Sequence, residues 1–184
     1  MNTGIQGNNI NIQAGNIVIK NNTTGIKGKN TKIEGGKLEV ELNNTGIDSV
    51  NLSTNLAQIE IKSNETGVKG ANIGLKAEQT VNISNNFTGV KGQNLGVKSN
   101  VVTISGNSKG VSGENVASLK GQNIVITSNK VGAEGENMYI KGSKVVVSNN
   151  TVGSQGNSIN VKADELIVVD NVLGFKQKQI KKPV

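Results

Sequence analysis

Glycine recurs every 21 or 22 residues along this chain, and the same pattern of residues surrounds each copy. A fixed period of this length is the sequence signature of a solenoid, in which each repeat forms one coil and packs on its neighbours. Because the period extends through nearly all of the 184 residues, it constrains the fold more than any other feature. We call the recurring residues the anchor glycines: Gly4, Gly25, Gly46, Gly67, Gly89, Gly110, Gly132, Gly153 and Gly174.

Apolar residues fill two columns before each anchor glycine, and most of them are Ile or Val. Residues two apart on a strand point to the same side, and β-branched residues favour strands, so we expect one short strand here. The column eight residues before the glycine contains Ile17, Leu38, Ile59, Val81, Val102, Ile124, Val145 and Leu166. The column six residues before it contains Ile19, Val40, Ile61, Ile83, Ile104, Ile126, Val147 and Val168.

Two further apolar faces follow each anchor glycine. The residue directly after the anchor glycine is Ile or Val in each coil from Ile5 to Val111. A second strand is expected to begin around the sixth residue after the glycine. The inward column of that strand contains Ile10, Thr31, Leu52, Ile73, Leu95, Val116, Met138 and Ile159. In the sixth coil a one-residue insertion then places Leu119 in the next inward position. Each coil is therefore expected to have about three short strands.

Asparagine forms two columns that we expect at corners. Asn tolerates the left-handed backbone that a corner needs, and stacked amides can also hydrogen-bond as a ladder along the axis. The first column, three residues before the glycine, is Asn22, Asn43, Asn64, Asn86, Asn107, Asn129, Asn150 and Asn171. The second, five residues after it, is Asn9, Asn30, Asn51, Asn72, Asn94, Asn115 and Asn137.

These columns predict an all-β fold, a single-stranded right-handed parallel β-helix of about three faces. It would have eight to nine coils of 21 or 22 residues, and right-handed winding is the usual hand of parallel connections. We expect residues 1–175 to form this β-solenoid and residues 176–184 to form an irregular or capping tail.

The composition argues against catalysis. The chain contains no Cys and no His, so the usual nucleophile–base pairs and soft metal sites are missing. The carboxylates are scattered, whereas glycan-processing β-helix enzymes need them clustered in a groove. We therefore expect no catalytic residue, cofactor, metal ion or small-molecule substrate. The N-terminus lacks the pattern of a signal peptide, and no apolar run is long enough to span a bilayer.

A lysine column is the sharpest surface feature of a chain with a formal net charge of +7. It follows the second strand in five successive coils, at Lys76, Lys98, Lys120, Lys141 and Lys162. One interpretation is a binding strip for a polyanion such as an anionic glycan. The simpler one is a solvated face whose charges keep sheets from sticking together. The lack of interleaved aromatic residues counts against nucleic acid.

The segments KGANIGLKAEQTVNIS (69–84) and KGQNLGVKSNVVTIS (91–105) resemble haemagglutinin-type repeats. These repeats build the β-helical shafts of filamentous haemagglutinins and of contact-dependent inhibition exoproteins, which are secreted by the two-partner route. The resemblance implies a shaft segment or adhesin on the bacterial surface or in secreted form, with a host surface as a partner. An alternative is a filament subunit that self-associates through its terminal coils, because bare parallel edges invite further pairing.

Overall fold

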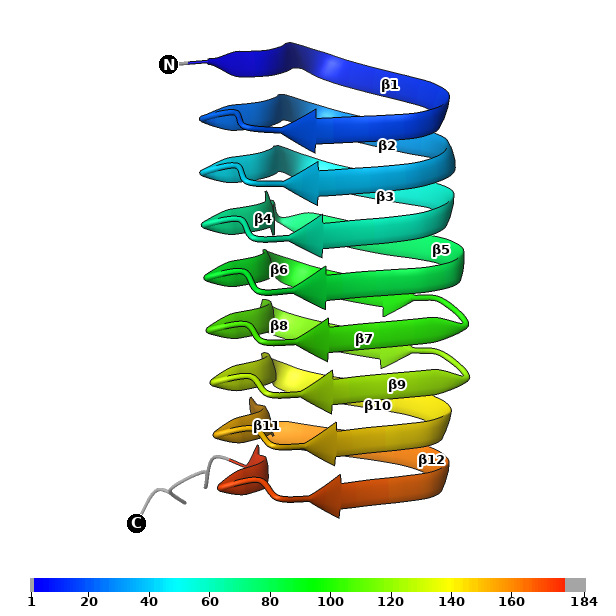
Figure 1. The fold of residues 1–184 in the computed structure, drawn as a ribbon, viewed down its shortest axis with the longest axis vertical. Helices are drawn as coiled ribbons and strands as arrows, with labels where there is room; N and C mark the ends of the chain where they lie inside the picture. Colours follow the sequence, from blue (N-terminus) through cyan, green and yellow to red (C-terminus); the bar gives the residue numbers. More distant parts are fainter. Residues whose placement is uncertain (1, 178–184) are drawn as a thin grey trace.

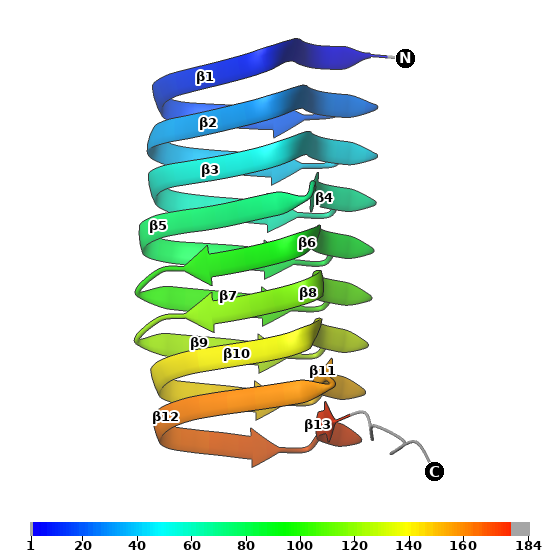
Figure 2. The same cartoon turned by 180° about the vertical axis from the view of Figure 1, so that it is seen from behind.

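The chain forms one stack of parallel β-coils, as the glycine period predicts. The structure is a computed structural model and describes residues 2–177. Figures 1 and 2 show the coils winding right-handed around a straight axis, from β1 at one end to β12 and β13 at the other. There are about 8 turns, and neighbouring coils lie about 21 residues apart in sequence. The irregular tail was predicted to begin at residue 176, but Lys176 and Gln177 still pair in register with Gln155 and Gly156. Residues 178–184 of the predicted tail lie outside the described residues.

Thirteen strands form a single parallel sheet that wraps around the core. In chain order they are β1 (Thr3–Lys20), β2 (Thr24–Glu41), β3 (Thr45–Lys62), β4 (Thr66–Lys69), β5 (Asn72–Ser84), β6 (Thr88–Lys98), β7 (Val101–Ser105), β8 (Lys109–Lys120), β9 (Asn123–Thr127), β10 (Val131–Ser148), β11 (Val152–Gly156), β12 (Ser158–Val169) and β13 (Leu173–Gln177).

The strands are longer than the three short strands per coil that the sequence suggested. β1, β2, β3 and β10 each run through 18 residues and bend at corners without losing their pairing. The register shows why, because like residues of successive coils pair directly, as Ile5 does with Ile26 and Ile26 with Ile47. A corner that keeps this register keeps its ladder of hydrogen bonds.

The sharpest turn of the coil lies next to the first asparagine column, not in it. The non-glycine residues with positive φ are the ones just before those asparagines, including Asn21, Leu42, Ser63 and Asn85. Neither asparagine column itself has a positive φ among the described residues. Our explanation of both columns by left-handed backbone was therefore wrong, and their amide ladders remain as the explanation.

The insertion in the sixth coil falls earlier than the sequence suggested. Val116 pairs with Asn94 and Asn137, so it stands in the second asparagine column, and Ala117 takes the inward position beside Leu95 and Met138. The register shift comes between Gly113 and Val116, because the extra residue bulges out there. Leu119 does fill the next inward position, opposite Val97 and Ile140, as predicted.

The interior is filled by the predicted apolar columns. Most of their members are fully buried, for example Ile61, Ile83, Ile104 and Ile126 at 0% exposure. The anchor glycine is required by this packing. A Cβ on Gly67 would lie 2.5 Å from the carbonyl oxygen of Gly89 and directly against Ile61. At this column a side chain would thus collide both with the next coil and with the core of its own coil.

Candidate functional site

Residues on the strand that follows the anchor glycine build the main candidate site. Successive side chains of a strand alternate between inside and outside, so the residues five, seven and nine positions after the glycine face solvent. In β5 these are Asn72, Gly74 and Lys76, and in β6 they are Asn94, Gly96 and Lys98. The strands that carry these rows lie stacked on the side of the molecule that Figure 2 turns to the viewer.

The structure brings the five predicted lysines together. Lys76 pairs with Lys98, Lys98 with Lys120, Lys120 with Lys141, and Lys141 with Lys162. All five are exposed and line one side of an open groove of about 680 Å³, which we call the lysine groove. Coils are about 4.8 Å apart, so the row of ammonium groups extends over about 19 Å.

Small residues separate the lysines from the other side of the lysine groove. They are Ala77, Ser99, Gly121, Gly142 and Ala163. A Cβ on Gly121 would lie 2.6 Å from the carbonyl oxygen of Ser99, so close approach of the backbones requires glycine there. The residues of the far side are Glu78, Asn100, Gln122, Ser143 and Asp164. Carboxylates therefore occur only at the two ends of the groove, and its three central coils present cations and neutral groups.

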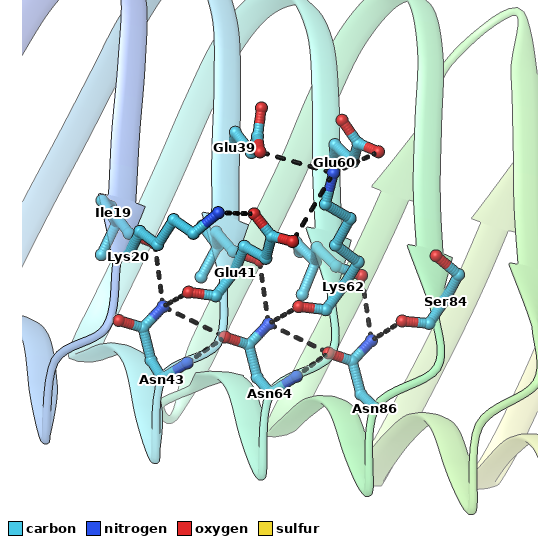
Figure 3. Close-up of polar contacts among 12 residues, drawn as sticks. Ile19, Lys20, Glu39, Glu41, Asn43, Glu60, Lys62, Asn64, Ser84 and Asn86 are labelled. Atoms are coloured by element: carbon cyan, nitrogen blue, oxygen red, sulfur yellow. Dashed lines mark hydrogen bonds and ion pairs between the residues drawn. The ribbon is translucent and has the colours of Figure 1, made fainter.

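Lysines on the strand that leads into the first asparagine column are paired with carboxylates, and Figure 3 shows Lys20 and Lys62 beside Glu39, Glu41 and Glu60. Lys37 contacts Glu60 at 2.9 Å and Glu39 at 3.3 Å, and Lys62 contacts Glu60 at 3.3 Å and Glu39 at 3.4 Å. Hydrogen bonds from Lys37 hold the pKa of both carboxyl groups below their ordinary value, and hydrogen bonding to Glu60 raises the pKa of Lys37 and Lys62. Among the described residues, no such ion pair involves a lysine of the lysine groove.

The first asparagine column forms a buried ladder that continues through all eight of its members. In each step the backbone N–H and the side-chain N–H of one asparagine donate to the amide oxygen of the next. For Asn43 the acceptor is Asn64 Oδ1, at 3.0 and 3.1 Å, and the same Nδ2 donates to Ile19 O at 2.8 Å. Figure 3 shows the steps from Asn43 to Asn64 and from Asn64 to Asn86. The ladder satisfies buried backbone groups at the turn and is structural.

The second asparagine column forms an exposed ladder, which is shorter than predicted. Single amide–amide hydrogen bonds of 2.8 to 2.9 Å join Asn9, Asn30, Asn51, Asn72 and Asn94. The insertion displaces Asn115, and Asn137 donates instead to its backbone oxygen at 3.4 Å. The prediction that Asn115 and Asn137 belong to this ladder was therefore wrong.

A second open groove, missed by the sequence reasoning, runs beside the exposed ladder. It has a volume of about 830 Å³, and its outward residues include Asn51, Ser53, Asn72, Gly74, Asn94 and Gly96. The outward column Ser53, Gly74, Gly96 and Ser118 carries almost no side-chain volume, with Lys32 before it and Tyr139 after it in register. We call these four residues the trough. The signal was present in the sequence as a column of small residues between two polar columns.

A separate polar cluster surrounds Glu134 on another face. Its carboxylate accepts hydrogen bonds from Ser112 Oγ at 2.7 Å, Lys109 Nζ at 2.8 Å and Gln155 Nε2 at 2.7 Å. Burial alone would raise the pKa of Glu134, but these hydrogen bonds outweigh it and hold the pKa below its ordinary value. Because all three donors come from neighbouring coils, the cluster ties coils together.

The described residues contain no group of three or more acidic, His or Cys side chains placed to hold a metal ion. No helix long and apolar enough to cross a membrane occurs in that part of the chain either. Comparison of the chain with protein-family models, with curated proteins and with solved structures found no match. The resemblance to haemagglutinin-type repeats therefore remains a prediction.

Proposed function

We propose that this chain is a structural, non-catalytic shaft segment of a bacterial surface or secreted exoprotein, with adhesive contacts on its lateral faces. One observation carries the architectural part of the proposal. The buried ladder passes without a break from Asn22 to Asn171 through every coil between them. Together with the buried apolar columns, the ladder means that the interior residues of each coil serve mainly to bind the next coil. The surface location rests on the repeat resemblance.

A shaft must tolerate changes in the number of its coils, because its role depends on length and stiffness. Deleting residues 46–66 removes one whole coil and joins Thr45 to Gly67, which preserves every column. We expect the variant to stay folded and to form a rod shorter by about 5 Å in solution X-ray scattering. The matched control deletes residues 46–60, breaks the register and should unfold. Loss of the fold after the whole-coil deletion would contradict an architectural role.

The location is tested separately in the parent cell. Antibodies against the solenoid should label intact, unpermeabilised cells or the culture medium, because a shaft acts outside the cell. Label that appears only after permeabilisation would overturn the surface assignment and leave the architectural part standing.

The second candidate function is a filament subunit that stacks end to end. Leu166 and Val168 are 48% and 41% exposed, whereas Val145 and Val147, their neighbours in the same inward columns, are 0% exposed. Stacking against another coil would bury these apolar side chains. Sedimentation velocity at increasing concentration should then show growing species, and Leu166→Lys with Val168→Lys should abolish them. A strictly monomeric rod at all concentrations argues against this candidate.

A further inference from the structure

We propose that the lysine groove and the adjoining trough form one binding surface for an acidic polysaccharide that lies along the solenoid axis. The site goes beyond the shaft function and does not depend on it. The inference rests on the arrangement of the outward rows in β5, β6 and β8, where both open grooves run over the same coils. Its steps are the uncompensated charge, the space beside it, the hydrogen-bonding row and the chemistry that fits all three.

The first step is the uncompensated charge. Lys98, Lys120 and Lys141 stand in register in three successive coils, opposite the neutral residues Asn100, Gln122 and Ser143. Ammonium groups one coil apart repel by about 1 kcal/mol in water, so the row favours a counter-charge that runs parallel to it. By contrast, Lys37 and Lys62, on the strands that lead into the first asparagine column, both form ion pairs with Glu60. Among the described residues, no carboxylate forms an ion pair with these three lysines.

The second step is the space next to the lysines. Gly96 has no heavy atom within 4 Å of the position of a Cβ, and for Gly74 only the carbonyl oxygen of Leu52, at 3.7 Å, comes that near. Neither glycine has a positive φ, so neither is required by the backbone. Glycine in the interior of a strand weakens it, and it often marks a place where a ligand approaches closely. The trough is thus open space beside the lysine row, since Gly74 and Gly96 lie two residues before Lys76 and Lys98 on the same outward face.

The third step is the row of amides on the other side of the trough. Asn51, Asn72 and Asn94 use one N–H of each side-chain amide for the exposed ladder. Since an amide nitrogen carries two hydrogens, each of them retains a second donor toward solvent. The amide row and the lysine row share β5 and β6, where Asn72 and Lys76, and Asn94 and Lys98, are four residues apart, which is about 13 Å. Over these two coils a chain lying in the trough therefore meets hydrogen-bonding groups on one flank and cations on the other.

The fourth step is the chemical class of the ligand. Hydroxyl groups match the amides, and carboxylate or sulfate groups match the ammonium groups, and an acidic polysaccharide carries both in a linear repeat. Tyr139, 45% exposed and in register with Ser118, offers a single aromatic face at one end of the trough. Single-stranded nucleic acids are held by aromatic side chains that stack with successive bases, and this surface has no such row among the described residues.

The first experiment measures the affinity of the protein for heparin and for polygalacturonate as a function of salt. The variant Lys98→Gln/Lys120→Gln/Lys141→Gln should weaken binding at least tenfold at low salt. It should also lower the slope of log K against log salt by about 2 to 3, because each of the three lysines that contacts the ligand contributes about 0.7 to 0.9 to that slope. The matched control Lys27→Gln/Lys29→Gln/Lys91→Gln removes the same charge from exposed lysines of another face. Equal losses in the two variants would overturn the site.

The second experiment separates the trough from the charge. Gly96→Leu fills the trough, leaves the net charge unchanged and has room for its Cβ. We expect the variant to keep its stability and to bind both polysaccharides at least fivefold more weakly. Unchanged binding would show that charge alone acts and would refute the trough. Single-stranded DNA of matched length is the competitor, and tighter binding of DNA than of either polysaccharide would overturn the proposed ligand class.

Discussion

At the scale of single residues, the two asparagine columns show how one residue type serves two purposes. The side chain of Asn64, which is 3% exposed, satisfies backbone groups of its own coil and of the preceding one, whereas exposed Asn72 makes only amide contacts with its own column. Both columns were visible in the sequence as invariant spacings. Which one is buried could not be predicted, because that depends on the turn beside Asn64, whose positive φ falls on Ser63.

Asn64→Ala tests the buried ladder. The substitution leaves the backbone N–H of Asn43 and the carbonyl oxygen of Val40 without their partners in a buried site. Unsatisfied buried groups are costly, so we expect the free energy of unfolding to fall by about 3 kcal/mol. Chemical denaturation measures the change, with the exposed Asn72→Ala as a control that should lose less than about 1 kcal/mol. Equal losses would mean that burial of the ladder is unimportant.

Ser154→Ala should stabilise the protein. Ser154 is 0% exposed, and its hydroxyl oxygen has no hydrogen-bond partner, although the same column contains fully buried Ala133 in the preceding coil. Removing an unsatisfied buried hydroxyl should raise the free energy of unfolding by about 1 kcal/mol. The same denaturation experiment decides the point. A loss of stability would show that the hydroxyl has a partner, such as a buried water molecule.

At the scale of elements, the sequence predicted the inward columns better than the strand boundaries. Alternation of apolar residues placed Ile59 and Ile61 correctly, because burial follows side-chain direction. Strand ends depend instead on whether a corner keeps its hydrogen-bond register, and no residue type signals that. The groove beside the exposed ladder was missed for a related reason. A column of Gly and Ser suggests nothing by itself until Asn and Lys are placed on either side of it.

The Glu134 cluster should make stability depend on pH. The pKa of Glu134 lies below its ordinary value of 4.5 in the folded protein, so the unfolded state binds the proton more readily. The contribution of Glu134 is therefore fully present well above pH 4.5 and is lost as the pH falls through the folded pKa. Glu134→Gln should reduce the free energy of unfolding by about 1 to 2 kcal/mol at pH 7 and flatten its decrease toward acid pH.

Thermal unfolding between pH 7 and pH 3 checks this. Glu114→Gln is the matched control, because the substitution removes the same charge. Glu114 is exposed and lines the same small groove as Glu134. The control should follow the wild type throughout. If both variants flatten the pH dependence equally, net charge and not the cluster is responsible. The lowered pKa of Glu39 and Glu60 should leave some acid sensitivity in every variant.

At the scale of the whole molecule, stability should vary along the axis, because a coil cannot bury its apolar residues alone. Strands in the middle pair on both sides, as β3 does with β2, β4 and β5, whereas β1 pairs only with β2 among the described strands. Exposure follows the same gradient, from 0% at Ile83 and Ile104 to 44% at Ile5. In a nearest-neighbour system, local opening should begin where a coil has one neighbour and spread inward.

Native-state hydrogen exchange tests this gradient. Backbone amides of Ile83, Ile104 and Ile126 should exchange at least tenfold more slowly than those of Ile167 and Val168, since opening a central coil breaks two interfaces at once. Ile61→Ala, which creates a cavity in β3, should speed exchange most in β3 and in its pairing partners, and progressively less in coils farther along the axis. Identical protection in all coils, with a uniform loss in the variant, would show that the solenoid opens only as one cooperative unit. The stiffness of the rod would then belong to the whole stack and not to contacts between neighbouring coils.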